Sequence, residues 1–456
     1  MENILFDFSK TSGIIKPMNA VNNGPTTPGV RKVRTNFEAY KAARIPFARN
    51  HDASFYAPYG GEHIVDVHRI FKNFDADEND PESYIFEPTD DYVKNTHDAG
   101  TKTFYRLGAS IEHYYKYGTR VPKDYGKWAR ICEHIIRHYT EGWANGFHYD
   151  IEYWEIWNEP DCLNGDGSNP CWQGTWEQFI DLYEVAAKHL KKCFPHLKIG
   201  GPAFATPEPY EFKDLFLKAV KERNIPLDFY SFHRYAKRVE DFEASIYAAV
   251  KNLEEIGVHP KELILNEWNY VRGWVEDIWY YSLDTEKNLK GASFVAGVMC
   301  VSQASPLDML MYYDARPCAM NGMFDSNTFE PLKPYYPFYI FSDLKEMGSY
   351  VKPYGNAKNI YSCGAKGDKS SGIMLTYFSD NDDGYWKDEP IAEKSKEITL
   401  NIVNPYPGKK VKVTLSVTDN EYNNAPIRGE EFSSDTFEVK LVAELYSVYY
   451  INIQEA

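Results

Sequence analysis

Short apolar segments alternate with longer segments of helical spacing along most of the chain. This alternation is typical of repeated βα units that build a parallel sheet. Eight strands are predicted, at residues 14–19, 45–50, 103–107, 153–157, 198–201, 229–233, 263–267 and 309–313. Eight strands, each followed by a helix, predict an α/β fold with a (β/α)8 TIM barrel over residues 10–350.

The helices of this barrel are predicted from apolar residues that recur at helical spacing. The clearest spans residues 176–192, with a capping box of Thr175 and Gln178 at its start and Pro195 after its end. The other predicted helices cover residues 125–139, 211–223, 239–255, 289–303 and 337–347.

From about residue 351 the apolar positions alternate with a period of two, as in residues 411–417. Turn-forming residues such as 404–408 separate these runs. The pattern predicts a C-terminal antiparallel β-sandwich-like accessory domain over residues 351–456. Residues 1–9 also fit a strand, which we expect to join that domain.

Charge and composition exclude several classes of partner. Lys and Arg total 50 against 66 Asp and Glu, and no basic run offers a grip on a phosphate backbone, so no nucleic-acid partner is expected. The longest uncharged stretch, residues 292–305, mixes Gly, Ser and Gln with its apolar residues and is too short to span a membrane. Seven scattered cysteines and a start without a secretory pattern predict a cytoplasmic chain with reduced thiols, Cys162 and Cys171 among them.

Two glutamates stand at the ends of predicted barrel strands, where barrel enzymes place their reacting groups. Glu159 follows the fourth strand and Glu267 ends the seventh, and each comes directly after an Asn. Glycosidic bond cleavage needs one carboxylic acid to protonate the leaving oxygen and one carboxylate at the anomeric carbon. One such Glu alone would more simply cap a helix or join an ion pair. Two on opposite sides of the barrel mouth predict a glycosidase.

The residues around Glu159, 154–161, resemble glycoside hydrolase family 39, the β-xylosidase and α-L-iduronidase family among the clan A retaining glycosidases. Residues 49–52 and 228–235 are similar to the same family, and the trailing β domain resembles its accessory sandwich. The resemblance implies that Glu159 is the general acid/base and that Glu267 is the nucleophile.

The same resemblance implies roles for four further residues. Asn158 would hold the sugar 2-hydroxyl, His233 and Tyr235 would line the site near the nucleophile, and His51 would contact the sugar. For both histidines, a hydrogen-bonded barrel histidine without a ligand role is the alternative.

Four more residues are expected to bind substrate. Asp314 and Arg316 follow the eighth strand, where they would bind sugar hydroxyls or an acidic sugar, or else form an internal ion pair that locks the loop. Trp268 and Tyr270, like Trp157, are candidates for stacking on a sugar ring, with core packing as the alternative.

Residues 75–86 begin like a calcium loop, but Asp80 stands where Gly is required and Phe86 where a bidentate Glu belongs. We expect a solvated loop there. The retaining mechanism needs no cation, so neither a metal nor a cofactor is expected.

Together these features predict a retaining, exo-acting glycosidase that removes a terminal sugar from plant-type oligosaccharides or glycosides, first of all a β-xylosidase. Residues 51–56 depart from the familiar xylosidase pattern, so arabinose, galactose, a uronic acid or a disaccharide unit stays open as the sugar. The loops at residues 52–80 and 108–123 are expected to close one end of the cleft. A non-catalytic carbohydrate-binding barrel and net glycosyl transfer are the alternative functions, and assembly into a homo-oligomer stays open.

Overall fold

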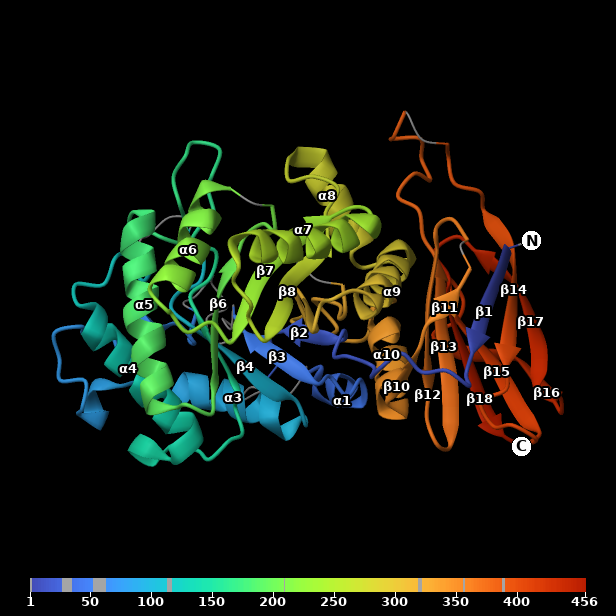
Figure 1. Ribbon diagram of the computed structural model, residues 1–456, viewed down its shortest axis with the longest axis horizontal. Coiled ribbons are helices and arrows are strands. Elements are labelled where there is room, and N and C mark those ends of the chain that lie inside the picture. Colours follow the sequence, from blue (N-terminus) through green and yellow to red (C-terminus); the bar gives the residue numbers. More distant parts are fainter. Residues whose placement is uncertain are drawn as a thin grey trace.

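The computed structural model describes residues 2–26, 35–51, 63–112, 117–208, 210–318, 322–355, 357–387 and 390–456. Eight parallel strands close into a barrel in chain order, from β2 to β9, and two further sheets pack beside it (Figure 1). The predicted TIM barrel with an accessory β domain is therefore confirmed.

Seven of the eight barrel strands lie where the apolar segments predicted them. The barrel strands are β2 (Ala20–Asn22), β3 (Phe47–Asn50), β4 (Lys102–Leu107), β5 (Tyr153–Ile156), β6 (Lys198–Phe204), β7 (Phe229–Ala236), β8 (Glu262–Tyr270) and β9 (Met309–Tyr312).

The first predicted strand, at residues 14–19, is wrong. The barrel strand is instead β2, which pairs with β3 and β9. Pro17 lies inside the predicted segment and lacks the N–H that a strand paired on both sides must donate. Lys16 instead contacts the segment that follows helix α9 (Leu289–Ala304). Its Nζ donates to the carbonyls of Ser305 and Leu307 at 2.7 and 2.6 Å.

Apolar side chains fill the barrel below the carboxyl ends of its strands. They come from six of the eight strands, and side chains fill the interior of a TIM barrel in this way. This inner layer consists of Ala20, Phe104, Tyr153, Phe229, Ile264, Met309 and Met311. It forms a solid floor, so that polar side chains one layer higher meet above it.

The six predicted helices all exist, with ends within two residues of the prediction, and the capping box at Thr175 is formed. They are α4 (Tyr125–Glu141), α5 (Trp176–Cys193), α6 (Glu211–Glu222), α7 (Glu240–Ile256), α9 (Leu289–Ala304) and α10 (Tyr335–Met347). The pattern missed helices that are short or carry few apolar residues, namely α1 (Phe37–Ala42), α2 (Val67–Ile70), α3 (Glu87–Asp98) and α8 (Glu276–Thr285). Two single 3₁₀ turns cover Pro81–Ser83 and Trp143–Asn145.

The accessory domain consists of two sheets whose inner faces share one apolar core. Its strands are β1 (Glu2–Asp7), β10 (Ser349–Val351), β11 (Pro353–Tyr354), β12 (Ile360–Lys366), β13 (Ser370–Tyr377), β14 (Ser395–Val403), β15 (Val411–Thr418), β16 (Ala425–Phe432), β17 (Thr436–Glu444) and β18 (Val448–Glu455). The first strand, β1, pairs with β14 in parallel, whereas the other pairs are antiparallel.

Helices α9 and α10 lie between the barrel and the accessory domain (Figure 1). Helix α9 contacts the barrel helix α7 on one side and strands β12 and β13 on the other, so it is buried over most of its length. This two-sided burial explains the uncharged stretch at residues 292–305. Among the described residues, no helix combines the length and the apolar character that crossing a membrane requires.

Candidate active site

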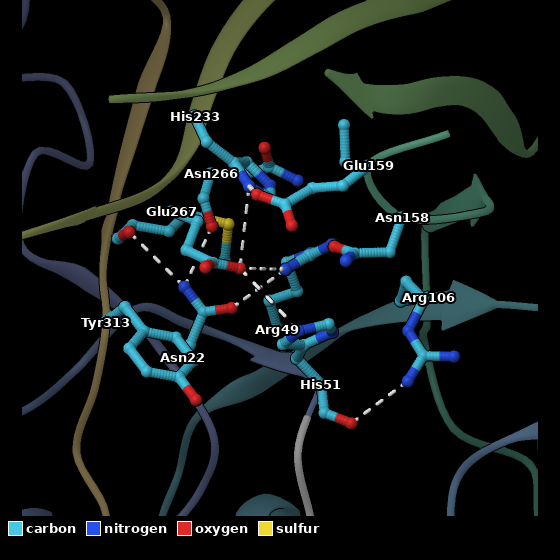
Figure 2. A network of polar contacts seen from close by, with 12 residues as sticks. Asn22, Arg49, His51, Arg106, Asn158, Glu159, His233, Asn266, Glu267 and Tyr313 are labelled. Atoms are coloured by element: carbon cyan, nitrogen blue, oxygen red, sulfur yellow. Dashed lines mark hydrogen bonds and ion pairs between the residues drawn. The ribbon is translucent and has the colours of Figure 1, made fainter. Parts of the chain in front are cut away.

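The two predicted catalytic glutamates converge above the floor of the barrel. Glu159 lies just after β5, with a left-handed φ of 46° and its backbone N–H bonded to the Ala203 carbonyl at 2.9 Å. Glu267 lies in β8 and is buried. His233 Nδ1 is 2.7 Å from Glu159 Oε1 and 3.7 Å from Glu267 Oε2 (Figure 2). One oxygen of each carboxylate lies within 4.8 Å of the other.

A β-bulge brings Glu267 to this point. Phe232 pairs with Leu265 and His233 pairs with Glu267, so Asn266 is an extra residue in β8. A bulge re-aims the side chains around it. Asn266 donates to Glu155 Oε1 at 2.6 Å. The carboxylate of its neighbour Glu267 points toward Arg49 and His233 (Figure 2).

Arg49 at the end of β3 links the groups of the site. Its Nε donates to Glu155 Oε2 at 2.7 Å, its Nη1 to Asn22 Oδ1 and Glu267 Oε2 at 3.1 Å each, and its Nη2 to Asn158 Oδ1 at 2.6 Å. Burial alone would lower the pKa of Arg49, but the charges of Glu155 and Glu267 raise it above its usual value. The guanidinium therefore stays charged and fixes the orientation of Glu267 and of Asn158.

Glu155 is fully buried and satisfied within the barrel. Besides Arg49 and Asn266, Ser231 donates to it at 2.6 Å. A buried carboxylate is tolerated when charge and hydrogen bonds compensate its lost hydration. Glu155 thus neutralises Arg49 from below, while Glu267 meets the same guanidinium from the side of the site.

Tyr235 contacts the candidate nucleophile directly. Its hydroxyl donates to Glu267 Oε1 at 2.7 Å. Burial, and then the negative charge of Glu267, raise the pKa of Tyr235 well above its usual value, so the phenol keeps its proton and remains a donor. The ring of Trp274, which is 58% exposed, stands edge-on to Tyr235 at 5.1 Å and stacks on Trp279.

His51 follows β3 and lies on the other side of Glu267. Its Nε2 is 3.7 Å from Glu267 Oε2, and its ring lies 6.2 Å from that of Tyr313. Arg106 holds the His51 carbonyl at 3.0 Å and is itself paired with Asp66 at 2.6 Å. The structure thus brings His51, Asn158, His233 and Tyr235 together around the two glutamates.

Asp314 and Arg316 form an internal ion pair, which is one of the two roles that the sequence left open for them. Arg316 Nη2 and Nε donate to Asp314 Oδ2 at 2.7 and 2.9 Å, and its backbone N–H donates to Oδ1 at 2.7 Å. Asp314 is fully buried. The pair orders the loop after β9, and Arg316 also donates to the hydroxyl of Tyr313 at 2.8 Å.

The prediction that Trp268 and Tyr270 stack on a sugar is wrong. Side chains alternate across a strand, and these two point out of the barrel while Glu267 points in. Trp268 is fully buried between Phe242 and Tyr312. The Tyr270 hydroxyl donates to Asp380 of the accessory domain at 2.5 Å. Trp157 is likewise a core residue, within the main apolar cluster.

Several residues of the site carried no predicted role. Arg49 and Glu155 are charged residues within or at the end of predicted barrel strands, and such charges must find partners, which is the signal in the sequence. Tyr313, Cys171 and Trp274 give no comparable local signal. The segment at residues 52–56 and parts of both cleft-closing loops lie outside the described residues.

Three groups of side chains among the described residues have the donors and spacing for a metal ion. Two of them share Glu159: one is completed by His233 and Glu267, the other by Cys162 and Cys171. The third lies on helices α4 and α5 and consists of Glu133, His189 and Cys193. The residues at 75–79 form turns, in which Asp77 accepts from the Asn79 backbone at 2.9 Å.

Comparison with known proteins places this site in a family. The family model described as Glycosyl hydrolases family 39 matches residues 56–283, half of the chain. The chain belongs to glycosyl hydrolases family 39. The resemblance found at residues 154–161 is thereby confirmed.

This family 39 chain is similar in sequence to a β-xylosidase and in fold to several solved structures. A β-xylosidase of Geobacillus stearothermophilus is 31% identical over 171 residues, which are 37% of this chain and 31% of that protein, so the match spans about a third of the relative. A glucosidase of Croceicoccus marinus has a similar fold, with a TM-score of 0.81 at 20% identity over 100% of this chain and 99% of that one. A monomeric β-xylosidase of Caulobacter crescentus has a TM-score of 0.72 at 13% identity over 100% of both chains.

Proposed function

We propose that this protein is a retaining glycoside hydrolase that removes a terminal sugar by double displacement. The observation that carries this proposal is the position of Glu159 and Glu267, whose nearest oxygens lie within 4.8 Å of one another. Retaining glycosidases hold their two carboxyl groups about 5–5.5 Å apart, whereas inverting enzymes leave about 6.5–9.5 Å for a water molecule. The short separation favours the retaining mechanism.

In this mechanism, Glu267 attacks the anomeric carbon while Glu159 gives its proton to the leaving oxygen. The sugar becomes bound to Glu267, and Glu159, now a carboxylate, takes a proton from the water that releases it. Arg49 and Tyr235 each donate to Glu267, which favours its charged form before attack. His233 holds Glu159 through Nδ1.

The sugar is proposed to be xylose, because the matched segment is shared with a β-xylosidase. Charge argues against a uronic acid, since the arginines near the site are already paired: Arg49 with Glu155 and Glu267, and Arg316 with Asp314. Terminal arabinose, galactose or a disaccharide unit remain alternatives. The Asn158 Oδ1 is held by Arg49, so its amide N–H groups are the donors for a sugar hydroxyl.

Hydrolysis of a panel of nitrophenyl glycosides by wild type, Glu159→Gln and Glu267→Gln tests the proposal. Wild type should release nitrophenol with retention at the anomeric carbon, which proton NMR of the first product shows. Both variants should lose roughly 10³-fold or more in kcat, because each lacks a group that reacts directly. A first product with inverted configuration would contradict the double displacement.

Azide separates the roles of the two glutamates. With an activated aryl glycoside, azide should rescue Glu159→Ala with a retained glycosyl azide, because azide needs no general base. With Glu267→Ala it should give an inverted azide, because it attacks in place of the nucleophile. The opposite assignment of products would exchange the two roles.

A non-catalytic sugar-binding barrel is the alternative from another class. If wild type and both Gln variants are equally inert yet bind sugar, that function replaces the proposed one. Product analysis at high acceptor concentration separates hydrolysis from net glycosyl transfer.

A cytoplasmic location and assembly into a homo-oligomer are also proposals. All seven cysteines are free thiols, which supports a reducing compartment. Fractionation of the native cells tests the location, and light scattering of the purified protein tests the oligomeric state.

A further inference from the structure

Two cysteines lie beside the proposed acid/base. Cys162 comes three residues after Glu159, and Cys171 lies further along the same loop. Cys171 Sγ is 3.8 Å from Glu159 Oε2, and the two sulfur atoms and the carboxylate oxygen all lie within 4.8 Å of one another. The proposed mechanism uses neither thiol.

The loop holds this arrangement through its own hydrogen bonds. The Cys162 backbone donates to the Glu159 carbonyl at 3.0 Å, and Trp157 Nε1 donates to the Cys171 carbonyl at 2.9 Å. Asn169 ties the two ends together, since it donates to the Pro160 carbonyl and accepts from the Cys171 backbone, both at 2.8 Å. The three ligand atoms are therefore brought together before any ion binds.

We propose that Glu159, Cys162 and Cys171 form a binding site for a thiophilic divalent cation, Zn²⁺ above all. Zinc takes thiolate and carboxylate ligands in a tetrahedral arrangement, with Zn–S near 2.3 Å and Zn–O near 2.0–2.2 Å, so its ligand atoms lie roughly 3.5–3.8 Å apart. The 3.8 Å contact of Cys171 with Glu159 already has this spacing. Binding releases the thiol protons to solvent.

Solvent reaches two of the three ligands. Cys171 is fully buried, whereas Cys162 is half-buried and the side chain of Glu159 is 15% exposed. The fourth position of the tetrahedron is left to water. The site is therefore partly open to solvent, which leaves a route for an ion.

The consequence of binding rests on the proposed function. A carboxylate oxygen bound to zinc carries no proton for the leaving group and is a poor base for water. Glu267 is not a ligand of this site and keeps its contacts with Arg49 and Tyr235. The site therefore makes Zn²⁺ a reversible inhibitor that acts on Glu159.

The third ligand group supplies a matched control. Glu133, His189 and Cys193 join α4 to α5 on the helical side of the barrel. Glu133 is also paired with Arg137 at 2.8 Å. Because Cys193 is the one thiol of that group, Cys193→Ser removes zinc binding there without touching the sugar pocket.

Metal binding is measured first and does not depend on activity. Zn²⁺ alone is titrated into Cys193→Ser by calorimetry, and Co²⁺ by absorption, with a non-thiol reductant that excludes disulfide formation. We expect one ion per chain and a thiolate-to-cobalt charge-transfer band. The double variants Cys162→Ser/Cys193→Ser and Cys171→Ser/Cys193→Ser should lose at least about tenfold in affinity. An unchanged affinity and band in both double variants would overturn the site.

Inhibition is measured next, with each variant compared with its own metal-free rate. Wild type and Cys193→Ser should be inhibited alike by Zn²⁺, and a chelator should restore their rates. Cys162→Ser should require at least about tenfold more Zn²⁺ for the same inhibition. Zinc bound at this site without loss of rate would overturn its inhibitory role. If the protein cleaves no glycoside, the titration still decides the site, and only the proposed function fails.

Discussion

Arg49 Nη1 lies 3.1 Å from Glu267 Oε2, inside a barrel interior where neither side chain is more than 9% exposed. The same guanidinium reaches Glu155 and Asn158, so one planar group positions residues from β5, the loop after it and β8. Such a group combines charge with fixed directions for its hydrogen bonds. Glu267, the proposed nucleophile, is therefore held in one orientation by a fully buried arginine.

Arg49→Lys should lower kcat roughly 100-fold with a smaller change in KM. Lysine keeps the charge, but one ammonium group cannot hold Glu155, Glu267 and Asn158 together, and small misplacements of reacting groups cost about that factor. Steady-state kinetics on a nitrophenyl glycoside measure both constants. Arg44→Lys, an exposed arginine paired with Asp343 and Glu346, is the control and should behave as wild type. Equal loss in both variants would contradict the positioning role.

Tyr235→Phe should lower kcat by about 10²-fold, because one hydrogen bond to the reacting carboxylate is lost. The acidic limb of the pH profile of kcat/KM should move to higher pH, since that hydrogen bond favours the charged form of Glu267. A merely structural role would leave the limb in place. Tyr183→Phe changes a buried tyrosine of α5 outside the site and should leave the profile unchanged.

Trp274→Ala should raise KM for a disaccharide by roughly 3–10-fold with little change in kcat. The exposed ring stands next to Tyr235 and offers a face on which the leaving sugar can stack. A nitrophenyl glycoside with its smaller leaving group should be affected less. Tyr280→Ala removes an exposed aromatic residue of α8 and serves as the control. A similar rise in KM for Tyr280→Ala would argue for a general effect of the helix.

The meeting of the candidate site residues was predictable because a TIM barrel fixes where the ends of its strands lie. Glu159, Glu267, His233 and Tyr235 lie in or just after strands whose apolar pattern is clear, and the structure brings all four together. The partners of Arg49 were not predictable in the same way. They lie 27, 106, 109 and 218 positions away along the chain, and no local pattern records such a pairing.

The direction in which strand side chains point was the second feature that the sequence did not predict. Trp268 and Tyr270 were expected in the site because they lie close to Glu267, yet strand alternation turns both toward helices and the accessory domain. The bulge at Asn266 shifts the register by one residue, which a periodic pattern does not reveal. The short strand β2 escaped notice since its three residues carry too little pattern.

In wild type, the free energy of unfolding should fall between about pH 4 and pH 7 because of Asp161, and Asp161→Asn should abolish this fall. Burial raises the pKa of Asp161 from 3.8 to about 7, although the charge of Lys213 opposes this. Below the unfolded pKa both states are protonated, and as pH rises through this window the folded state retains a proton that the unfolded state has lost. Wild-type stability therefore falls across the window, by roughly 4 kcal/mol at most.

Urea unfolding of Asp161→Asn and wild type at pH 4 and pH 8 measures this difference. The free energy of unfolding of the variant, relative to that of wild type, should increase as pH rises. Asp228→Asn should show the opposite sign. Burial alone would raise the pKa of Asp228, but hydrogen bonds from Lys191 and Lys261 hold it below its usual value. The stability that the ionised Asp228 contributes is present above the pKa of the unfolded state and is lost as pH falls. The same pH trend in both variants would contradict the assigned shifts.

Asp380→Ala should destabilise the contact between the barrel and the accessory domain. Asp380 is buried and accepts from Tyr270, from Arg272 at 3.2 Å and from Trp386 at 2.8 Å, while Lys290 lies 3.3 Å away. Arg272 keeps Asp383 at 2.9 Å and Lys290 keeps Asp382 at 2.7 Å, so the loss is that of the buried hydrogen bonds to Asp380, roughly 1–3 kcal/mol.

Urea unfolding measures the loss in Asp380→Ala, and Glu455→Gln is the control. Glu455 pairs with Lys409 on the surface, where an exposed ion pair contributes at most about 1 kcal/mol. Because Tyr270 belongs to the strand that carries Glu267, the same variant tests whether the accessory domain helps to position Glu267. A stability loss with unchanged kcat at a temperature where the variant is folded would assign Asp380 to support of the fold alone. A drop in kcat under those conditions would extend the accessory domain's role to the position of β8.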